Sequence, residues 1–274
     1  SDNTATTING GGMYQREAYD SVLAGNSSRE GGGAYDAVLS NCMVVGNVAS
    51  NRGGGTRSGT LAHCQIISNR IGGVTDRWGA GAYGGVFSNC VFAYNVNPSG
   101  PGGGVNIGTL YNCLVYANRA TDGGGTIEST LINCTVIGNS GSANGGGVAC
   151  WGTGRNVINS IIYSNKAGVS RDDCGGNLTL SNCCYTTNSG WPVSAVVASI
   201  TNNPLVLDFG SGYGTNHVAG NYRLQTASPC VNTGTNAPGL LTAVDLDGRP
   251  RIRYGTVDMG AYEAVYGGSI LSVR

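Results

Sequence analysis

The chain has 274 residues, of which 48 are glycine, and its 15 basic residues balance its 15 acidic residues. Nucleic-acid-binding proteins usually carry an excess of Lys and Arg, so this balance argues against that class. Glycine occurs in clusters rather than at every third position, which excludes collagen. With 40% hydrophobic and only 11% charged residues, the composition is not that of a disordered chain.

A short repeat runs through most of the chain. Cysteine recurs at positions 42, 64, 90, 113 and 134, in steps of 22, 26, 23 and 21 residues. Ser21, Ser160 and Cys183 continue the series, which gives eight repeats. Each repeat has an asparagine five positions further on: Asn26, Asn47, Asn69, Asn95, Asn118, Asn139, Asn165 and Asn188. Because helical repeats need about 33 residues or more, this period predicts a strand-based coil.

The fold predicted from this repeat is all-β: a single right-handed parallel β-helix with three short strands per rung of about 22 residues. The residue before each Cys or Ser, such as Asn41, is expected at a tight bend, because Asn tolerates left-handed backbone conformations. We divide the chain into an N-terminal segment (1–9), eight regular rungs (10–190), irregular closing rungs (191–263) and a tail (264–274).

Two residue columns are predicted to form internal ladders. The cysteine column, with the apolar residue two positions later, is the more regular face of its strand and is assigned to the interior. Its cysteines are Cys42, Cys64, Cys90, Cys113, Cys134 and Cys183. The asparagine column is a second structural ladder, represented by Asn47, Asn69, Asn95, Asn118, Asn139 and Asn165. Stacked asparagine side chains can hydrogen-bond from rung to rung.

The opposite face of the same strand forms an outward apolar stripe. We call it the outer stripe: Val22, Met43, Gln65, Val91, Leu114, Thr135, Ile161 and Cys184, with Ala24, Val45, Ile67, Ala93, Tyr116, Ile137, Tyr163 and Thr186. An apolar stripe of this length is not expected to face water. We predict that another copy or the chain's own C-terminal segment covers it, and that Val45, Ile67, Tyr116, Ile137 and Tyr163 mark the interface.

The repeat resembles those of a known protein class. The order Gly-Gly-Gly, Leu-x-Asn-Cys-x-Val and Asn is similar to right-handed parallel β-helix repeats of bacterial surface proteins, including polymorphic outer-membrane and autotransporter passenger repeats. Residues 221–224, 228–234, 245–251 and 257–263, which include Asp-Leu-Asp-Gly-Arg-Pro-Arg and Val-Asp-Met-Gly-Ala-Tyr-Glu, resemble the closing motif of such proteins. The resemblance implies export to the cell surface or medium and a structural or adhesive role.

The cysteines admit several interpretations. The ladder cysteines are interpreted as a stack of small buried side chains, with disulfides along the ladder or a metal or redox role as alternatives. Cys150 and Cys174 lie off the ladder and are about one rung apart, so they are a candidate disulfide. No cofactor is expected.

Candidates for an active site are few. Asp172 and Asp173, near Lys166, form the best local acidic cluster, and a solvated turn is the simpler interpretation. The acidic and arginine residues of the closing motif are expected to form a paired network, with calcium binding as the alternative. The sequence therefore favours a non-catalytic structural or adhesive module over its alternative, a carbohydrate-active enzyme such as a polysaccharide lyase or glycosidase, or a glycan-binding protein.

The expected partners are other copies of the chain or cell-surface and extracellular components, including polysaccharide, with no nucleic acid and no membrane span. A β-helix has two open ends, and strand character in residues 264–274 predicts end-to-end association by strand addition. The alternative is that a further segment of the protein caps the first rung. We keep both as expectations.

Overall fold

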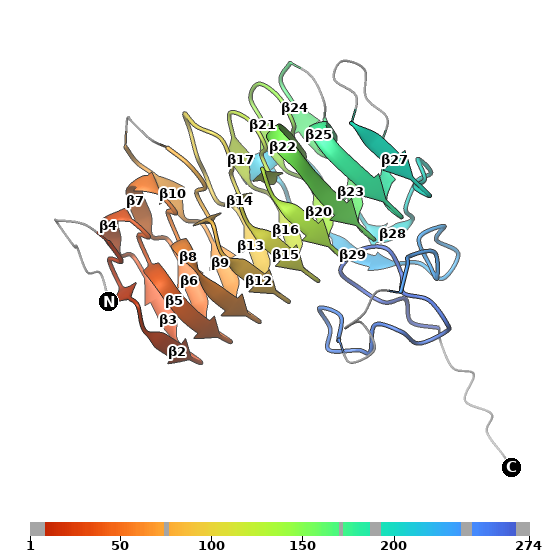
Figure 1. Cartoon of the computed structure of the whole chain (residues 1–274), viewed down its shortest axis with the longest axis horizontal. Coiled ribbons are helices and arrows are strands. Elements are labelled where there is room, and N and C mark those ends of the chain that lie inside the picture. Colours follow the sequence, from red (N-terminus) through yellow and green to blue (C-terminus); the bar gives the residue numbers. More distant parts are fainter. Residues whose placement is uncertain (1–8, 74–76, 170–171, 187–192, 237–242, 267–274) are drawn as a thin grey trace, which may run out of the picture.

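The computed structural model describes residues 9–73, 77–169, 172–186, 193–236 and 243–266. Parallel strands stack rung upon rung into an elongated β-solenoid (Figure 1). This confirms the all-β solenoid with three strands in each rung. Among the described residues the one helical element is a 3-10 turn, η1 (Gly214–Asn216).

The largest sheet has 13 strands and combines two strand segments from most rungs. Its strands are β1 (Met13–Tyr14), β2 (Glu17–Tyr19), β5 (Ala34–Ser40), β8 (Thr56–Ala62), β11 (Ala82–Tyr83), β12 (Val86–Ser88), β14 (Val105–Asn106), β15 (Thr109–Tyr111), β18 (Thr126–Ile127), β19 (Thr130–Ile132), β22 (Val148–Ile158), β25 (Cys174–Ser181) and β27 (Ala195–Val197). In most rungs a left-handed residue such as Ser58 or Ile107 separates or bends the two segments.

The second sheet carries the outer stripe and has eight parallel strands. They are β3 (Val22–Ala24), β6 (Met43–Val45), β9 (Gln65–Ile67), β13 (Val91–Ala93), β16 (Leu114–Tyr116), β20 (Thr135–Ile137), β23 (Ile161–Tyr163) and β26 (Cys184–Tyr185). Every pair is in register, so residues of one column lie directly above one another.

The third face consists of two three-stranded sheets joined by bridges through Val96. They contain β4 (Ser27–Glu30), β7 (Val48–Arg52) and β10 (Arg70–Ile71), and β17 (Arg119–Ala120), β21 (Ser140–Gly141) and β24 (Lys166–Ala167). A triple glycine precedes six strands of the 13-stranded sheet, β1, β5, β8, β14, β18 and β22, and packs against the next rung. At Gly32 and Gly54 an added Cβ would lie within about 2.5 Å of a neighbouring main-chain oxygen, so no larger residue fits there.

The core is built from the inward columns that the sequence predicts. Leu39, Cys42 and Val44, with their equivalents in the other rungs, form one continuous buried cluster. Repeats this short cannot bury a core singly, so stacking of the rungs supplies the hydrophobic stabilisation.

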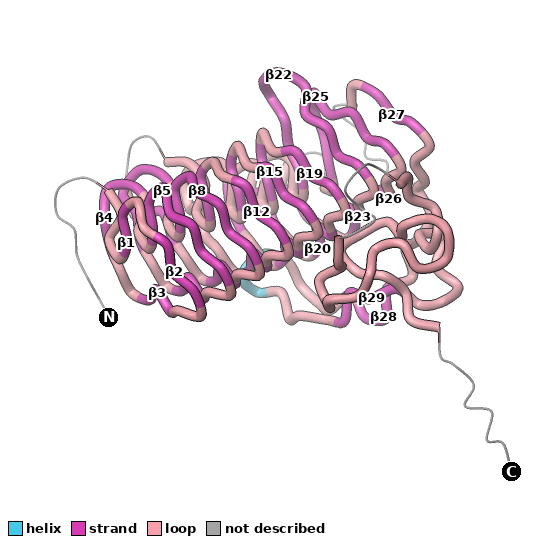
Figure 2. Tube along the Cα trace, turned by 60° about the horizontal axis from the view of Figure 1, so that its bottom comes forward, coloured by secondary structure: helices cyan, strands magenta, loops and turns pink. Residues whose placement is uncertain are grey.

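The rungs end earlier than the sequence predicts. Strand β27 and a bridge between Ile200 and Cys184 form a partial ninth rung. The C-terminal segment, which we define as residues 203–236 and 243–266, does not stack as further rungs. It contains the antiparallel pair β28 (Val206–Asp208) and β29 (Asn221–Leu224) and lies beside the solenoid, near β20, β23 and β26 (Figure 2).

Candidate interaction surface

Two ladders of buried side chains run along the solenoid, one just before and one just after the strands of the second sheet. In the asparagine ladder from Asn26 to Asn165, the main-chain N–H and the side-chain amide of each residue donate to Oδ1 of the next asparagine, at 2.9–3.0 Å. Because the asparagines are buried, these bonds satisfy polar groups that water does not reach. The predicted ladder at Asn47, Asn69, Asn95, Asn118, Asn139 and Asn165 is therefore present; Asn188 lies outside the described residues.

The cysteine ladder is a second internal column. The main-chain N–H of Cys42 donates to Sγ of Cys64 at 3.4 Å, and the N–H of Cys64 donates in the same way to Cys90. All ten cysteines are free and buried in the structure. Burial raises the pKa of the Cys113 thiol well above its usual range, and that of Cys183 to about 12. Such thiols stay protonated and are poor nucleophiles, in keeping with a packing role.

Exposure of the outer stripe changes along the solenoid. At the N-terminal end Val22 is 63% exposed and Met43 is 36% exposed. From β16 onward the same column is covered: Leu114 is 5% exposed, and Thr135 and Ile161 are 1% exposed. The stripe thus has an open part on β3, β6 and β9 and a covered part from β16 to β26.

The chain's own C-terminal segment makes the cover. Tyr222, Ala261 and Tyr262 pack with Leu114 and Ile137 in one buried cluster. In a second cluster Met259 and Cys230 of the C-terminal segment pack with Ile161 and Cys184. Among the predicted interface residues, Ile137 is fully buried, and Tyr116 and Tyr163 are half-buried against this cover. Val45 and Ile67 lie on the open part and are half-buried.

The bend residues provide polar anchors for the cover. All eight have positive φ, as the sequence predicts: Asp20, Asn41, His63, Asn89, Asn112, Asn133, Asn159 and Asn182. Asn89 donates to the main-chain oxygens of Val244 and Asp245, at 3.2 and 2.8 Å. Asn159 donates to the main-chain oxygen of Thr235 at 2.9 Å and accepts from its N–H at 2.8 Å. The bend column therefore binds the main chain of a segment that lies on the sheet.

On the open part the bend column is exposed. Asp20, Asn41 and His63 line a shallow pocket of about 270 Å³ together with Val22, Met43 and Gln65. The Asn41 side chain donates to the side chain of Asp20 at 2.5 Å. The open part therefore repeats the chemistry of the covered part, with polar bend residues beside an apolar stripe.

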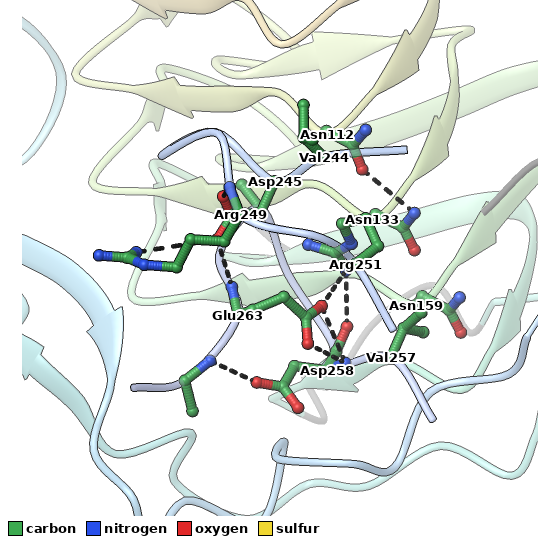
Figure 3. A network of polar contacts seen from close by, with 12 residues as sticks. Asn112, Asn133, Asn159, Val244, Asp245, Arg249, Arg251, Val257, Asp258 and Glu263 are labelled. Carbon is green, nitrogen blue, oxygen red and sulfur yellow. Dashed lines mark hydrogen bonds and ion pairs between the residues drawn. The ribbon is translucent and has the colours of Figure 1, made fainter. Parts of the chain in front are cut away.

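The closing motif forms a buried polar network (Figure 3). Arg251 is 0% exposed, lies 3.2 Å from a carboxylate oxygen of Glu263 and donates to the main-chain oxygen of Asp258 at 2.8 Å. Asp245 accepts from the N–H of Glu263, and Asp258 accepts from the N–H of Ala264. Burial raises the pKa of Glu263 to about 8, against the opposing effect of Arg251. The polar groups of the closing motif are thus paired with one another inside the segment that covers the stripe, as the sequence predicts.

Two further arginines, Arg223 and Arg249, lie at the surface of this segment. Arg223 contacts Asp247 through two hydrogen bonds of 2.6 and 2.5 Å, and Arg249 contacts the same carboxylate. Arg223 first of all, and then Arg249, lowers the pKa of Asp247. Both guanidinium groups thus form ion pairs with the Asp247 carboxylate.

His217 holds another part of the C-terminal segment against the solenoid. His217 is 4% exposed, and its imidazole lies 2.7 Å from the Tyr222 hydroxyl and 2.8 Å from the Gly212 oxygen, where it leaves no room for a Cβ at Gly138 of the solenoid. Tyr94 donates to the main-chain oxygen of His217 at 3.2 Å. The sequence shows no partner for His217, because these contacts join distant parts of the chain.

The acidic pair Asp172 and Asp173 separates into two different roles. Asp173 is 1% exposed and accepts from the N–H and the side-chain amide of Asn165, at 2.8 and 2.9 Å. It therefore occupies the next position of the asparagine ladder, and a solvated turn is the wrong interpretation for it. Asp172 is partly exposed and lies 3.3 Å from Lys166. Burial raises the pKa of Asp173 to about 6.

The candidate disulfide partners are free in the structure. The register sets Cys174 opposite Val148 and Cys150 opposite Gly176. The Cys150 thiol donates to Glu128 at 3.3 Å. Pairing of Cys150 with Cys174 stays a prediction. Within the described ranges, no group of three or more His, Cys, Asp or Glu residues is placed to hold a metal ion.

The sequence analysis missed one member of the cysteine ladder, Ser199. Ser199 accepts from the main-chain N–H of Cys183 at 3.0 Å, as Ser160 does from Cys134. It stands 16 residues after Cys183, which is too short a step for the repeat, although Ser21 and Ser160 show that serine can fill the column.

No helix in the described part of the chain has both the length and the apolar character needed to cross a membrane. No known protein family matches the sequence, and no curated protein is similar to it.

Proposed function

We propose that this protein is a non-catalytic extracellular structural and adhesive module that associates with further copies of itself through the open part of the outer stripe. The observation that carries the proposal is the change in exposure along one continuous stripe. The C-terminal segment covers the stripe from β16 to β26, whereas Val22 and Met43 are 63% and 36% exposed. The extracellular location rests on the resemblance to bacterial surface repeats.

The open part suits a polypeptide partner. Where the stripe is covered, bend asparagines bind main-chain groups while apolar side chains pack beside them. Asp20, Asn41 and His63 present the same positions on the open part, next to Val22 and Met43. An extended segment that packs on the open part would continue the interface that the C-terminal segment already makes.

A second copy offers a complementary apolar surface. The C-terminal segment exposes three apolar side chains, Leu207 by 54%, Tyr213 by 43% and Val218 by 64%. A contact between this surface of one copy and the open part of another joins two different patches. Such a contact is heterologous and, unless it closes into a ring, extends into a filament.

The oligomeric state tests the proposal. Light scattering is measured on the wild type, on a Val22→Lys/Met43→Lys variant and on a matched Val38→Lys/Val86→Lys control, whose residues are 42% and 43% exposed on the first sheet. The wild type and the control are expected to grow in mass with concentration, and the stripe variant to stay monomeric. A wild type that is monomeric at every concentration, or a control that dissociates equally, contradicts the proposal.

The second class, a carbohydrate-active protein, has one residue in its favour: Asp172 is a partly exposed carboxylate beside Lys166. Digestion of a polysaccharide panel with and without calcium tests it. Sugar release that disappears in Asp172→Asn would establish this class in place of the non-catalytic one.

A further inference from the structure

Two cysteines from different parts of the fold meet beneath the C-terminal segment. Cys184 belongs to β26 on the last full rung, and Cys230 belongs to the turn that lies over it. Both are 0% exposed and share a buried cluster with Ile161 and Met259. They stand 46 positions apart in the sequence.

The surroundings of the pair set it apart from the cysteine ladder. The ladder thiols donate to main-chain oxygens of their own strand and the rung below, as Cys113 does to Tyr111 at 3.2 Å. The Cys184 thiol instead donates to the oxygen of Asn202 at 3.1 Å, and the neighbouring Cys230 thiol, ahead of burial, raises its pKa. Cys230 is fixed by its N–H to Ser228 Oγ at 3.1 Å and by its oxygen, which accepts from Met259 at 2.9 Å.

We propose that Cys184 and Cys230 form a disulfide that staples the C-terminal segment onto the last rung when the protein folds in the presence of a small-molecule disulfide. One thiolate attacks the reagent, forms a mixed disulfide and releases one reagent thiol. The second thiolate attacks the protein sulfur of the mixed disulfide and releases the other reagent thiol. In total two cysteines are oxidised, their two protons pass to the released reagent sulfurs, and one disulfide reagent is reduced to two thiols.

Burial explains when the bond forms and why it persists. Before the C-terminal segment docks, Cys184 lies on the outward face of its strand, where a reagent reaches it. After docking both sulfurs are fully buried, so an external thiol cannot attack the bond. The staple would restrict the unfolded chain and secure the cover of the stripe.

Refolding tests the staple on the full chain. The wild type is refolded in oxidised and reduced glutathione, alkylated in denaturant and weighed. We expect a species with eight alkylated cysteines and two fewer hydrogens, and non-reducing peptide mapping that links residues 184 and 230. Cys230→Ser should abolish the link, whereas the matched ladder variant Cys113→Ser should keep it.

A stability measurement adds a second readout. Wild type that is reduced in denaturant and refolded without an oxidant should melt several degrees lower than the oxidised form, whereas the same treatment should leave the melting temperature of Cys230→Ser unchanged. Ten alkylated cysteines after oxidative refolding, or a link that joins Cys184 or Cys230 to a different cysteine, would overturn the proposal. The mapping needs only the wild type, so a variant that fails to fold does not prevent the test.

Discussion

Asp173 takes both donors of Asn165, the main-chain N–H at 2.8 Å and the side-chain amide at 2.9 Å, just as each asparagine of the ladder takes those of its neighbour. An aspartate therefore continues a column of asparagines. Its second oxygen accepts from Thr186, so the carboxylate is bonded on both sides. The asparagine ladder therefore ends in a side chain, that of Asp173, whose protonation changes with pH.

This relationship gives the first prediction, for Asp173→Asn. Burial raises the pKa of Asp173 to about 6 in the folded state from 3.8 when exposed, so its contribution to stability is complete below pH 3.8 and is lost as pH rises through 6. The loss is at most about 3 kcal/mol, since one pKa unit corresponds to about 1.4 kcal/mol. Urea unfolding at pH 4 and pH 7 should show a smaller decline for Asp173→Asn than for the wild type. An unchanged decline would contradict the assignment.

Glu263 predicts a second pH effect, in the C-terminal segment. Burial raises its pKa to about 8 from 4.5, so the stability it contributes falls as pH rises between these values. Glu263→Gln keeps acceptor and size and should flatten the decline between pH 5 and 8. Asp247→Asn is the matched control of opposite sign, because Arg223 lowers the pKa of Asp247 and its contribution is lost as pH falls. Urea unfolding at pH 5 and pH 8 is the measurement.

The cysteine ladder predicts which substitutions the core accepts. Cys113 Sγ accepts from the N–H of Cys90 at 3.5 Å, and Ser160 fills the same role for Cys134 at 3.0 Å. Cys113→Ser should therefore fold with a modest loss of stability. Cys113→Val removes the acceptor and leaves the buried N–H of Cys90 unpaired, at a cost of about 1–3 kcal/mol. Equal or greater stability of the valine variant in chemical denaturation would show that the hydrogen bond contributes nothing.

Ile107 predicts a stabilising change. Its φ is +58°, a left-handed conformation in which a β-branched residue is strained, and its side chain is 43% exposed. Ile107→Asn should raise the free energy of unfolding by about 1 kcal/mol, because Asn tolerates this conformation. Val86→Asn is the control: Val86 is equally exposed but lies in strand β12, where Asn relieves no strain. A gain in both variants would mean that removing an exposed apolar side chain, and not relief of backbone strain, stabilises the protein.

The bend column predicts how the cover is held. Asn159 exchanges two hydrogen bonds with Thr235, whereas Asn112 bonds the side chain of Asn133 within the column. Asn159→Ala should loosen the C-terminal segment and increase amide hydrogen exchange at residues 228–236, by roughly tenfold for about 1.4 kcal/mol. Asn112→Ala should leave exchange there unchanged. Equal protection in both variants would mean that apolar packing alone holds the cover.

The sequence by itself determined the solenoid. The rungs share the same local features: a glycine cluster that lets the main chains of neighbouring rungs approach closely, a left-handed bend residue, and inward residues such as Cys42, Val44 and Asn47. Because the rungs stack in register, every column read from the sequence becomes a column in space. The ladders and the inward and outward faces therefore follow from the spacing of residues about one rung apart.

Only the tertiary structure decided how far the outer stripe is covered and by what. The cover depends on contacts such as that of Asn89 with Val244, 155 positions away, and on the pairing of His217 with Tyr222 in a segment without repeats. The same holds for Asp173 and Ser199, which join the ladders at steps that the period does not predict. A repeat encodes contacts between neighbouring rungs, whereas a segment that folds back finds its partners through shape, burial and hydrogen bonding in three dimensions.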